Sequence, residues 1–355
     1  KLNPTEYGIY DFLYVLSIFL LPIITMLMEE SMFRFLIDAD NEEKRKKIIN
    51  QSIIYIVIST IIFSLIGIII TKLINFDYGL IFILYIISNV LIALSNAITR
   101  GMGNFKIFSI SNFFTGFITI LLNVYFLLNL KIGIIGLFLA SIIANTLVSL
   151  VVLIKMKIYK YFSKGFLDRK LLKEMIKYSI PLVPNNVSLS IINLSDRLII
   201  TSFLGSAQNG IYAISNKIPN IMNTFYSFFY TAWQESSAKA LSKENTNEYY
   251  NSIYIAIKNF LYAILICIIT AIPFIFSILI NESYCEAYLY IPILILGVYY
   301  SNISGFYGGI FTAYKSTKIL GITTTIAAII NLVVNLLLIK SIGVYAAAIS
   351  TLIAN

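Results

Sequence analysis

Long apolar stretches, one after another, constrain this chain more than any other feature of its sequence. Each runs for about 20 residues, the length that an α-helix needs to cross the hydrocarbon core of a bilayer. The complete stretches are 7–28, 52–74, 80–99, 107–129, 132–154, 178–204, 209–232, 253–280, 288–313 and 319–339, and a partial one runs from 343 to 355. They are too long for barrel strands and lack an alternation of polar and apolar residues. The sequence therefore predicts an all-α, polytopic membrane protein.

The composition supports this class and excludes several functions. Apolar residues make up 59% of the chain and charged residues only 12%, whereas about 25% of the residues of a soluble protein are charged. The chain has no histidine, which removes His-ligated zinc, a histidine base and a Ser-His-Asp triad. Cys267 and Cys285 are too far apart for a CxxC motif. We therefore expect no metal site, no cofactor and no enzyme activity.

Positive charge is divided unevenly between the two ends of the predicted spans. Most of the 26 Lys and Arg residues lie in the loops after the first, third, fifth, seventh and ninth spans, and the opposite side holds only Lys1, Lys72, Lys131 and Lys340. Because Lys and Arg are enriched in cytoplasmic loops, the crowded side is predicted to be cytoplasmic. The net charge of +9 is then a topology signal. We expect a multi-pass protein of the plasma (inner) membrane with no nucleic-acid partner.

Short motifs recur at a separation of just over 200 residues. The tripeptide Gly-Ile-Tyr at 8–10 recurs at 210–212, and Ile-Gly at 132–133 recurs at 342–343. An offset of six spans gives both copies the same orientation, as in parallel repeats related by an axis along the membrane normal. The repeats predict two six-helix lobes around a central cavity.

These lobes have expected bounds. The N-terminal lobe is predicted over 1–154 with five visible spans. A cytoplasmic linker with an amphipathic helix follows over 155–177, and the C-terminal lobe covers 178–355 with five spans and part of a sixth. By the same repeat, we expect the sequence to be a fragment that lacks the first helix of the first lobe and the end of the chain.

Polar side chains form one stripe on the predicted helix 178–204. At 100° per residue they fall within a sector of about 160°. The stripe comprises Asn185, Asn186, Ser190, Asn193, Asp196, Arg197 and Thr201. It cannot face lipid, because an unpaired polar group in hydrocarbon costs several kcal/mol. Either the stripe lines a water-filled cavity, or Asp196 and Arg197 form a pair that ties the helices together.

The span 209–232 has a second stripe and a predicted break at Pro219. Its polar residues are Tyr212, Asn216, Asn220, Asn223, Thr224 and Ser227, with Lys217 at the edge. Arg197 and Lys217 lie at similar distances from the turn that joins the two spans, so both are expected at one depth. Two cations at one depth suit an anionic ligand. The alternative is that Lys217 pairs with Asp196 and leaves Arg197 free.

Asp11 is the remaining carboxylate within a span, about one turn inside 7–28. It is either a solvated residue at the mouth of the protein or a carboxylate that couples transport to protons or sodium ions. Since the chain has no histidine, a proton-driven transporter would have to use a carboxylate. Asp11 and Asp196 are therefore the candidates for ion coupling.

Three segments resemble polysaccharide exporters, the O-antigen-flippase-like members of the multidrug/oligosaccharidyl-lipid/polysaccharide flippase superfamily. Residues 4–10, Pro-Thr-Glu-Tyr-Gly-Ile-Tyr, resemble the motif that follows the first helix of that family. Pro-Leu-x-Pro at 181–184, followed by Asp-Arg-Leu-Ile-Ile at 196–200 and Phe-Leu-Gly at 203–205, is similar to its seventh helix. Gly-Ile-Tyr-Ala at 210–213 with Lys217 resembles the start of the eighth.

The resemblance implies a two-lobed transporter that moves polyprenyl-pyrophosphate-linked oligosaccharides across the plasma membrane by alternating access. Basic cavity residues in such a family would bind the pyrophosphate or acidic sugars, a role that falls here to Arg197 and Lys217. Asn185, Asn186, Asn193, Asn216, Asn220 and Asn223, with Asp196, would line the cavity. The implied partners are membrane lipids and polysaccharide-assembly enzymes.

Three other functions remain to be weighed. A cation-coupled multidrug exporter of the same superfamily would need buried carboxylates, of which the chain offers Asp11 and Asp196. An integral-membrane glycosyltransferase or polymerase needs a general base and commonly a sizeable external loop, but the outer loops here are only a few residues long. A purely structural protein would not need polar stripes inside its spans. No nucleotide-binding GxxxxGK[ST] motif occurs, so energy would come from a gradient, a coupled ion or substrate consumption.

Overall fold

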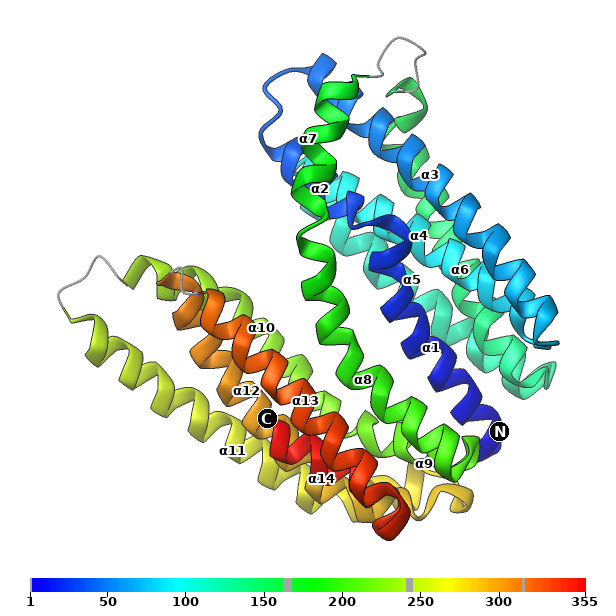
Figure 1. The fold of residues 1–355 in the computed structure, drawn as a ribbon, viewed down its shortest axis with the longest axis vertical. Helices are drawn as coiled ribbons and strands as arrows, with labels where there is room; N and C mark the ends of the chain where they lie inside the picture. The colour runs from blue at the N-terminus through cyan, green and yellow to red at the C-terminus, as the bar shows by residue number, and fades with distance from the viewer. Residues whose placement is uncertain (1, 162–167, 241–244, 315–316) are drawn as a thin grey trace. The chain divides into compact units, whose positions relative to one another are not determined.

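The computed structural model describes residues 2–161, 168–240, 245–314 and 317–355 (Figure 1). Within these ranges the chain forms helices and no strand, which confirms the all-α class. Eight of the described helices are long and apolar enough to cross a membrane, with mean hydropathy between 1.4 and 2.9. The chain is therefore a multi-pass membrane protein.

Contacts between residues divide the chain into two compact units. Unit 1 comprises Lys1–Leu2 and Leu13–Ser190, and unit 2 comprises Asn3–Phe12 and Ile191–Asn355. The boundaries at 12/13 and 190/191 fall inside helices, α1 (Pro4–Thr25) and α8 (Leu182–Leu204), and not in loops. The predicted bounds of the two lobes and their linker stay a prediction.

Unit 1 holds most of α1 and the helices up to the first part of α8. Its further elements are α2 (Met28–Ile37), α3 (Glu42–Leu73), α4 (Gly79–Gly101), α5 (Phe105–Val124), the π-helical turn η1 (Tyr125–Asn129), α6 (Gly133–Lys155), the 3-10 turn η2 (Ile158–Tyr161) and α7 (Arg169–Ser179). Helix α4 packs against α2, α3 and α6, and α5 packs against α6. Helix α7 overlaps the segment in which the sequence predicts an amphipathic helix, and Asp168 caps it by accepting hydrogen bonds from the backbone N–H groups of Lys170 and Leu171.

The helix break between α1 and α2 uses two residues other than glycine. Met26 and Leu27 both have φ of 51°, in the left-handed region that L-residues rarely adopt. The turn is held by the side chain of Thr25, whose Oγ1 accepts a hydrogen bond from the backbone N–H of Leu27. This break places the start of α2 inside unit 1, where Met28 and Met32 are fully buried.

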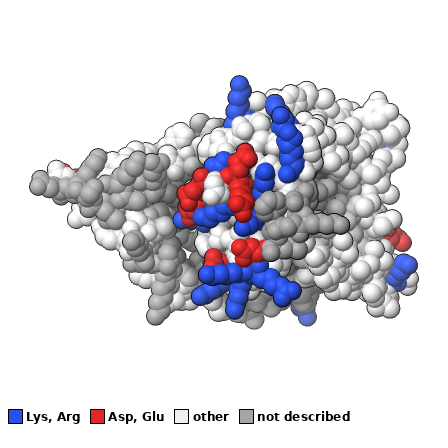
Figure 2. Space-filling model, turned by 90° about the horizontal axis from the view of Figure 1, so that it is seen from above, with Lys and Arg blue, Asp and Glu red and all other residues white. Residues whose placement is uncertain are grey.

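Charged side chains gather at the end of unit 1 that carries α7 and the start of α3. Figure 2 looks onto this end and shows Lys and Arg side chains around a group of Asp and Glu. Lys47 lies 2.9 Å from Glu43 in an exposed ion pair. A hollow of about 440 Å³ lies here, lined by Asn41, Glu43, Lys44, Lys47, Asp168, Lys170, Leu171 and Glu174. Cations and carboxylates alternate around it, so the hollow carries little net charge.

Unit 2 begins with the start of α1 and continues from the second half of α8. Its further elements are α9 (Ser206–Lys217), α10 (Pro219–Ala240), α11 (Thr246–Leu279), the 3-10 turn η3 (Glu282–Tyr284), α12 (Ala287–Ala313), α13 (Thr317–Ile342) and α14 (Tyr345–Ala354). The expected span 209–232 corresponds to two helices, α9 and α10, which meet at Pro219. The predicted break is confirmed.

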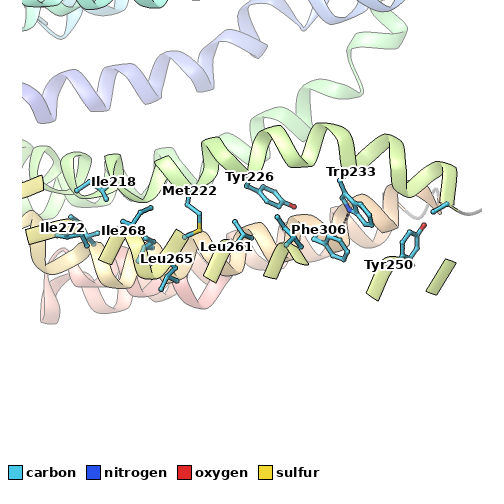
Figure 3. Close-up of a cluster of buried hydrophobic side chains, with 14 residues drawn as sticks. Ile218, Met222, Tyr226, Trp233, Tyr250, Leu261, Leu265, Ile268, Ile272 and Phe306 are labelled. Atoms are coloured by element: carbon cyan, nitrogen blue, oxygen red, sulfur yellow. Dashed lines mark hydrogen bonds between the residues drawn. The ribbon is translucent and has the colours of Figure 1, made fainter. Parts of the chain in front are cut away.

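One hydrophobic cluster of unit 2 lies where α10 packs against α11 and α12 (Figure 3), and a second joins residues of α8, α9, α12, α13 and α14. The ring of Trp233 stacks on that of Phe306, with 4.4 Å between centroids, and Trp233 Nε1 donates to the carbonyl oxygen of Phe306 over 3.0 Å. A Cβ atom on Gly309 would lie 2.6 Å from the indole, and one on Gly305 would lie 2.9 Å from the hydroxyl of Tyr226. Small residues one turn apart on α12 thus make room for the aromatic side chains of α10.

The start of α1 crosses the start of α9 at two glycines, inside unit 2. A Cβ atom on Gly8 would overlap the carbonyl oxygen of Ser206, and one on Gly210 would overlap that of Pro4. Asn209 Nδ2 also donates to the carbonyl oxygen of Gly8 over 2.8 Å. Glycine at both positions allows the backbones to approach this closely. The two copies of the repeated Gly-Ile-Tyr motif therefore meet each other.

Candidate functional site

Asp196 lies at the centre of a polar cluster in unit 2 and is 2% exposed. Its carboxylate accepts hydrogen bonds from three other helices. Tyr212 Oη of α9 donates to Oδ2 over 3.0 Å, and Thr351 Oγ1 of α14 donates to the same oxygen over 3.1 Å. Asn335 Nδ2 of α13 donates to Oδ1 over 2.8 Å. Four helices, with α8 itself, thus converge on one carboxylate.

Arg197, the next residue of α8, pairs with Asp11 of α1. Its Nε lies 3.3 Å from Oδ2 of Asp11, and the two residues are 8% and 7% exposed. The guanidinium carbon also lies 5.2 Å from the ring centroid of Tyr212, within cation–π range. Asp11 belongs to the part of α1 that lies in unit 2, so this pair is internal to that unit.

The cluster contains one more acidic group than basic group. Asp11 and Asp196 are two carboxylates, and Arg197, which pairs with Asp11 and follows Asp196 in the chain, is the cation that the described residues place beside them. All three are buried, and an uncompensated charge away from water is costly. The site therefore favours one additional positive charge, either a proton or a small cation.

Unpaired amide oxygens beside Asp196 suit such a cation. The Oδ1 atoms of Asn331 and Asn335 are buried and, among the described residues, have no hydrogen-bond partner. Asn331 Nδ2 lies 3.3 Å from the hydroxyls of Ser350 and Thr351, which places Asn331 next to the partners of Asp196. Carboxylate, amide and hydroxyl oxygens are the donors that hard cations prefer. Within the described residues no group of three or more His, Cys, Asp or Glu side chains could hold a metal, so the donor set does not fit a transition metal.

The other predicted site residues do not all join this cluster. Asn193 is exposed, and its carbonyl oxygen accepts a hydrogen bond from Arg197 over 3.3 Å. Asn216 Nδ2 donates to the carbonyl oxygen of Tyr212 over 2.8 Å. Asn223 Nδ2 donates to Oδ1 of Asn220 over 3.1 Å. These polar groups lie on α8, α9 and α10, and none of the hydrogen bonds given for them joins the carboxylate of Asp11 or Asp196.

Three other predicted site residues are not part of the buried cluster around Asp196. Lys217 is exposed at the end of α9, and no ion pair among the described residues includes it. Asn186 lies in the part of α8 that belongs to unit 1, where its Nδ2 donates to the carbonyl oxygen of Leu182. The side chain of Asn185 lies outside the described residues. The partner of Arg197 is thus Asp11, and the side chains that bond Asp196 are neutral.

Sequence reasoning missed Asn331, Asn335 and Thr351. The two asparagines are four residues apart in the apolar span 319–339, so they share one face of a helix. An amide pair inside an apolar span is the signal that could have marked α13 as part of the site. Thr351 gave no such signal, since a threonine can satisfy its hydroxyl on its own helix.

A second buried carboxyl group, Glu29 of α2, lies in unit 1 and was also missed. It is 7% exposed, and Thr25 Oγ1 donates to its Oε1 over 3.0 Å. Its Oε2 is buried and has no partner among the described residues. A cavity of about 340 Å³ adjoins it, lined also by Glu30, Asn96 and Arg100. Helix α2 is outside the candidate spans, and burial raises the pKa of Glu29 from its ordinary value of 4.5 to about 7.

This raised pKa predicts that the free energy of unfolding falls as pH rises. The folded chain holds the Glu29 proton more tightly than the unfolded chain. The contribution of Glu29 to the free energy of unfolding is therefore fully present below pH 4.5 and is lost as pH rises to about 7. The expected loss is about 3 kcal/mol, at 1.36 kcal/mol per pKa unit. In detergent, thermal unfolding between pH 4.5 and 8 should show the decline, and Glu29→Gln should remove most of it. Glu30→Gln, at the exposed neighbouring residue, is the control; an unchanged slope in Glu29→Gln would contradict the prediction.

Comparison with known proteins identifies relatives of the sequence and of the fold. Residues 1–234 match the family described as "Polysaccharide biosynthesis protein", and residues 181–337 match the family described as MatE. No curated protein matches the chain.

Several solved structures share the fold. An inward-facing multidrug resistance MATE family transporter of the MOP superfamily has a TM-score of 0.76 at 13% identity, over 100% of this chain and 92% of that chain. A variant of the MATE transporter VcmN of Vibrio cholerae has a TM-score of 0.62 at 13% identity, over 99% and 84% of the two chains. At this identity the likeness concerns the fold alone.

Proposed function

Because this chain belongs to the polysaccharide biosynthesis protein family, we propose that it is a flippase for polyprenyl-pyrophosphate-linked oligosaccharides. The observation that carries the proposal is the family match over residues 1–234. The fold of a membrane transporter supports translocation by alternating access and not an enzymatic reaction. The substrate would be the precursor of a cell-surface polysaccharide, and the membrane the plasma membrane. Polysaccharide-assembly enzymes remain predicted partners.

The substrate contacts that we propose lie on α9 and α10. Lys217 is an exposed cation without a counter-charge of its own among the described ion pairs, and it would bind the pyrophosphate through charge-assisted hydrogen bonds. Asn216, Asn220 and Asn223 offer amides that suit sugar hydroxyls. Arg197 is the second proposed cation. Its bond to Asp11 means that it would bind an anion only after Asp11 is protonated or moves away.

Asp196 is the residue that we propose for ion coupling. Its surroundings supply neutral hydrogen-bond donors and unpaired amide oxygens, while Arg197 is already paired with Asp11. A proton on the carboxylate would neutralise the excess charge. A sodium ion bound by the carboxylate and by the Oδ1 atoms of Asn331 and Asn335 would also neutralise it, once the Asn335 amide turns its oxygen toward Asp196. Binding and release of that ion would bias the helices α8, α9, α13 and α14, which meet at Asp196.

A multidrug exporter of the same superfamily is the second candidate function. The match of residues 181–337 to MatE and the similarity to MATE transporters favour it. The two functions differ in the charge of the ligand, because a multidrug exporter commonly takes organic cations. Lys217 would attract a pyrophosphate and repel a cation, so one substitution has opposite consequences for the two substrate classes.

Lys217→Ala is expected to lower the flipping of a fluorescent polyprenyl-pyrophosphate oligosaccharide in proteoliposomes about 10-fold to 150-fold at low substrate concentration, since a hydrogen bond to a charged group contributes about 1.5–3 kcal/mol. Lys258→Ala is the control, because Lys258 belongs to α11, where its ammonium lies over the ring of Tyr254 of the same helix. Flipping at the wild-type rate in Lys217→Ala would contradict the proposed contact. Faster efflux of a lipophilic cation by Lys217→Ala, with no flipping by the wild type, would favour the multidrug function instead.

A further inference from the structure

Helices α5 and α6 of unit 1 enclose an apolar groove with a volume of about 260 Å³. Ile110, Phe114 and Ile118 line it from α5, and Leu147 and Val151 line it from α6. Four of these side chains are at least 44% exposed, and Val151 reaches 61%. Both helices belong to candidate membrane spans. The groove therefore lies at the depth of the bilayer, and it is open in the part of the chain that the structure describes.

One end of the groove carries positive charge. Lys155, in the last turn of α6, lines the groove together with the apolar residues. Asn104, which precedes α5, donates from Nδ2 to the sulfur of Met156 over 3.6 Å, so the start of α5 and the end of α6 lie together. Lys106 is in the first turn of α5, at this same end. Both lysines lie on the side of the membrane that the charge distribution predicts to be cytoplasmic.

The protein offers these lysines no counter-charge from the neighbouring helices. Neither is in an ion pair among the described residues. The sequence contains no Asp or Glu between Asp77 and Asp168. That interval covers α4, α5, α6 and the short turns η1 and η2, which are the elements that α5 and α6 pack against. Any anion that pairs with Lys155 or Lys106 would therefore come from outside this part of the fold.

We propose that this groove binds an anionic phospholipid of the cytoplasmic leaflet. One acyl chain would lie along Ile110, Phe114 and Val151, and the phosphate would accept hydrogen bonds from Lys155 and Lys106. A zwitterionic phospholipid offers the same chain but no net charge, so the lysines provide selectivity for the headgroup. A basic residue near the membrane surface contributes about a fivefold difference in affinity for an anionic lipid. This lipid site is independent of the proposed transport function.

The experiment measures lipid binding to the purified full chain by native mass spectrometry. The probes are phosphatidylglycerol and phosphatidylcholine with identical acyl chains. We expect the wild type to retain phosphatidylglycerol in preference to phosphatidylcholine. Lys155→Gln and Lys106→Gln should each weaken phosphatidylglycerol binding about fivefold and leave phosphatidylcholine unchanged. Lys72→Gln is the matched control, because Lys72 is an exposed lysine in the last turn of α3 on the opposite side.

A second variant tests the apolar part of the site without any change in charge. Val151→Trp would fill the groove from an exposed position and should weaken binding of both phospholipids. Equal retention of the two phospholipids by the wild type would overturn the proposal, and so would an equal effect of Lys72→Gln. Displacement of phosphatidylglycerol by a polyprenyl phosphate that binds more tightly through the same lysines would also overturn it, by assigning the groove to the transported class of lipid.

Discussion

Arg197→Ala is expected to lower the free energy of unfolding by about 3–5 kcal/mol, the usual cost of removing one partner from a buried ion pair. Arg197 pairs with Asp11 and follows Asp196 in the chain, and all three residues are less than 9% exposed. Without the guanidinium, the two buried carboxylates would lose the cation beside them. Equilibrium unfolding of the purified protein in mixed micelles would measure the change.

The controls for Arg197→Ala are variants that leave a different number of charges in the cluster. Asp11→Asn leaves one carboxylate with one guanidinium, so it should cost much less than Arg197→Ala. In the double variant, Asp11→Asn should recover part of the loss caused by Arg197→Ala. Lys217→Ala removes an exposed cation from α9 and should change the free energy of unfolding by less than about 0.5 kcal/mol. Equal losses in Arg197→Ala and Asp11→Asn would show that side-chain packing, and not charge, sets the effect.

Asp196→Asn is expected to abolish the dependence of transport on an ion gradient. The substitution keeps the size of the side chain but fixes it in a neutral form that neither gains nor loses a proton and attracts a sodium ion poorly. Since a coupling free energy of 1–3 kcal/mol corresponds to about 5-fold to 150-fold, gradient-driven flipping should fall by that factor. The measurement compares flipping in proteoliposomes with and without imposed proton and sodium gradients.

Sodium coupling and proton coupling predict different results for the same preparation. Under sodium coupling, wild-type transport should follow the sodium gradient, and Asn335→Ala should weaken that dependence, because it removes one proposed oxygen ligand. Under proton coupling, transport should follow the pH gradient. Glu282→Gln is the control, since Glu282 is an exposed carboxylate in η3 that takes no part in the buried cluster. A variant Asp196→Asn that still responds to either gradient as the wild type does would exclude Asp196 from coupling.

The helical fold could be predicted because the membrane imposes its thickness on the sequence. Apolar stretches of about 20 residues marked the spans, and Pro219 marked the break between α9 and α10. The ends of helices were harder to predict. Helix α3 begins at Glu42, well before the expected start at residue 52, because Asn41 caps it by accepting a hydrogen bond from the backbone N–H of Lys44. Where a helix continues beyond the membrane, its residues become polar although its backbone hydrogen bonds continue, so hydropathy no longer marks where the helix begins.

The partners in the site could not be predicted from periodicity. The stripe on α8 indicated which residues share a face, but it contains no information about the helix opposite. Arg197 pairs with Asp11, 186 residues away, and Asp196 bonds to Asn335 and Thr351, 139 and 155 residues away. Glu29 was missed for a related reason. Its burial depends on a turn with positive φ at Met26 and Leu27. The sequence has no glycine at these positions that would have indicated such a turn.

The glycine crossing between α1 and α9 has the reciprocity of a two-fold interface. Gly8 faces Ser206, and Gly210 faces Pro4. In the repeat, Gly8 corresponds to Gly210 and Pro4 corresponds to Ser206, so the two contacts are equivalent. In symmetric homodimers, residue i contacts j while j contacts i. A half-length ancestor that dimerised through this surface would have set one glycine against its own copy, and gene duplication would have joined the two copies in one chain. The two halves would then have diverged around a contact that neither could alter alone.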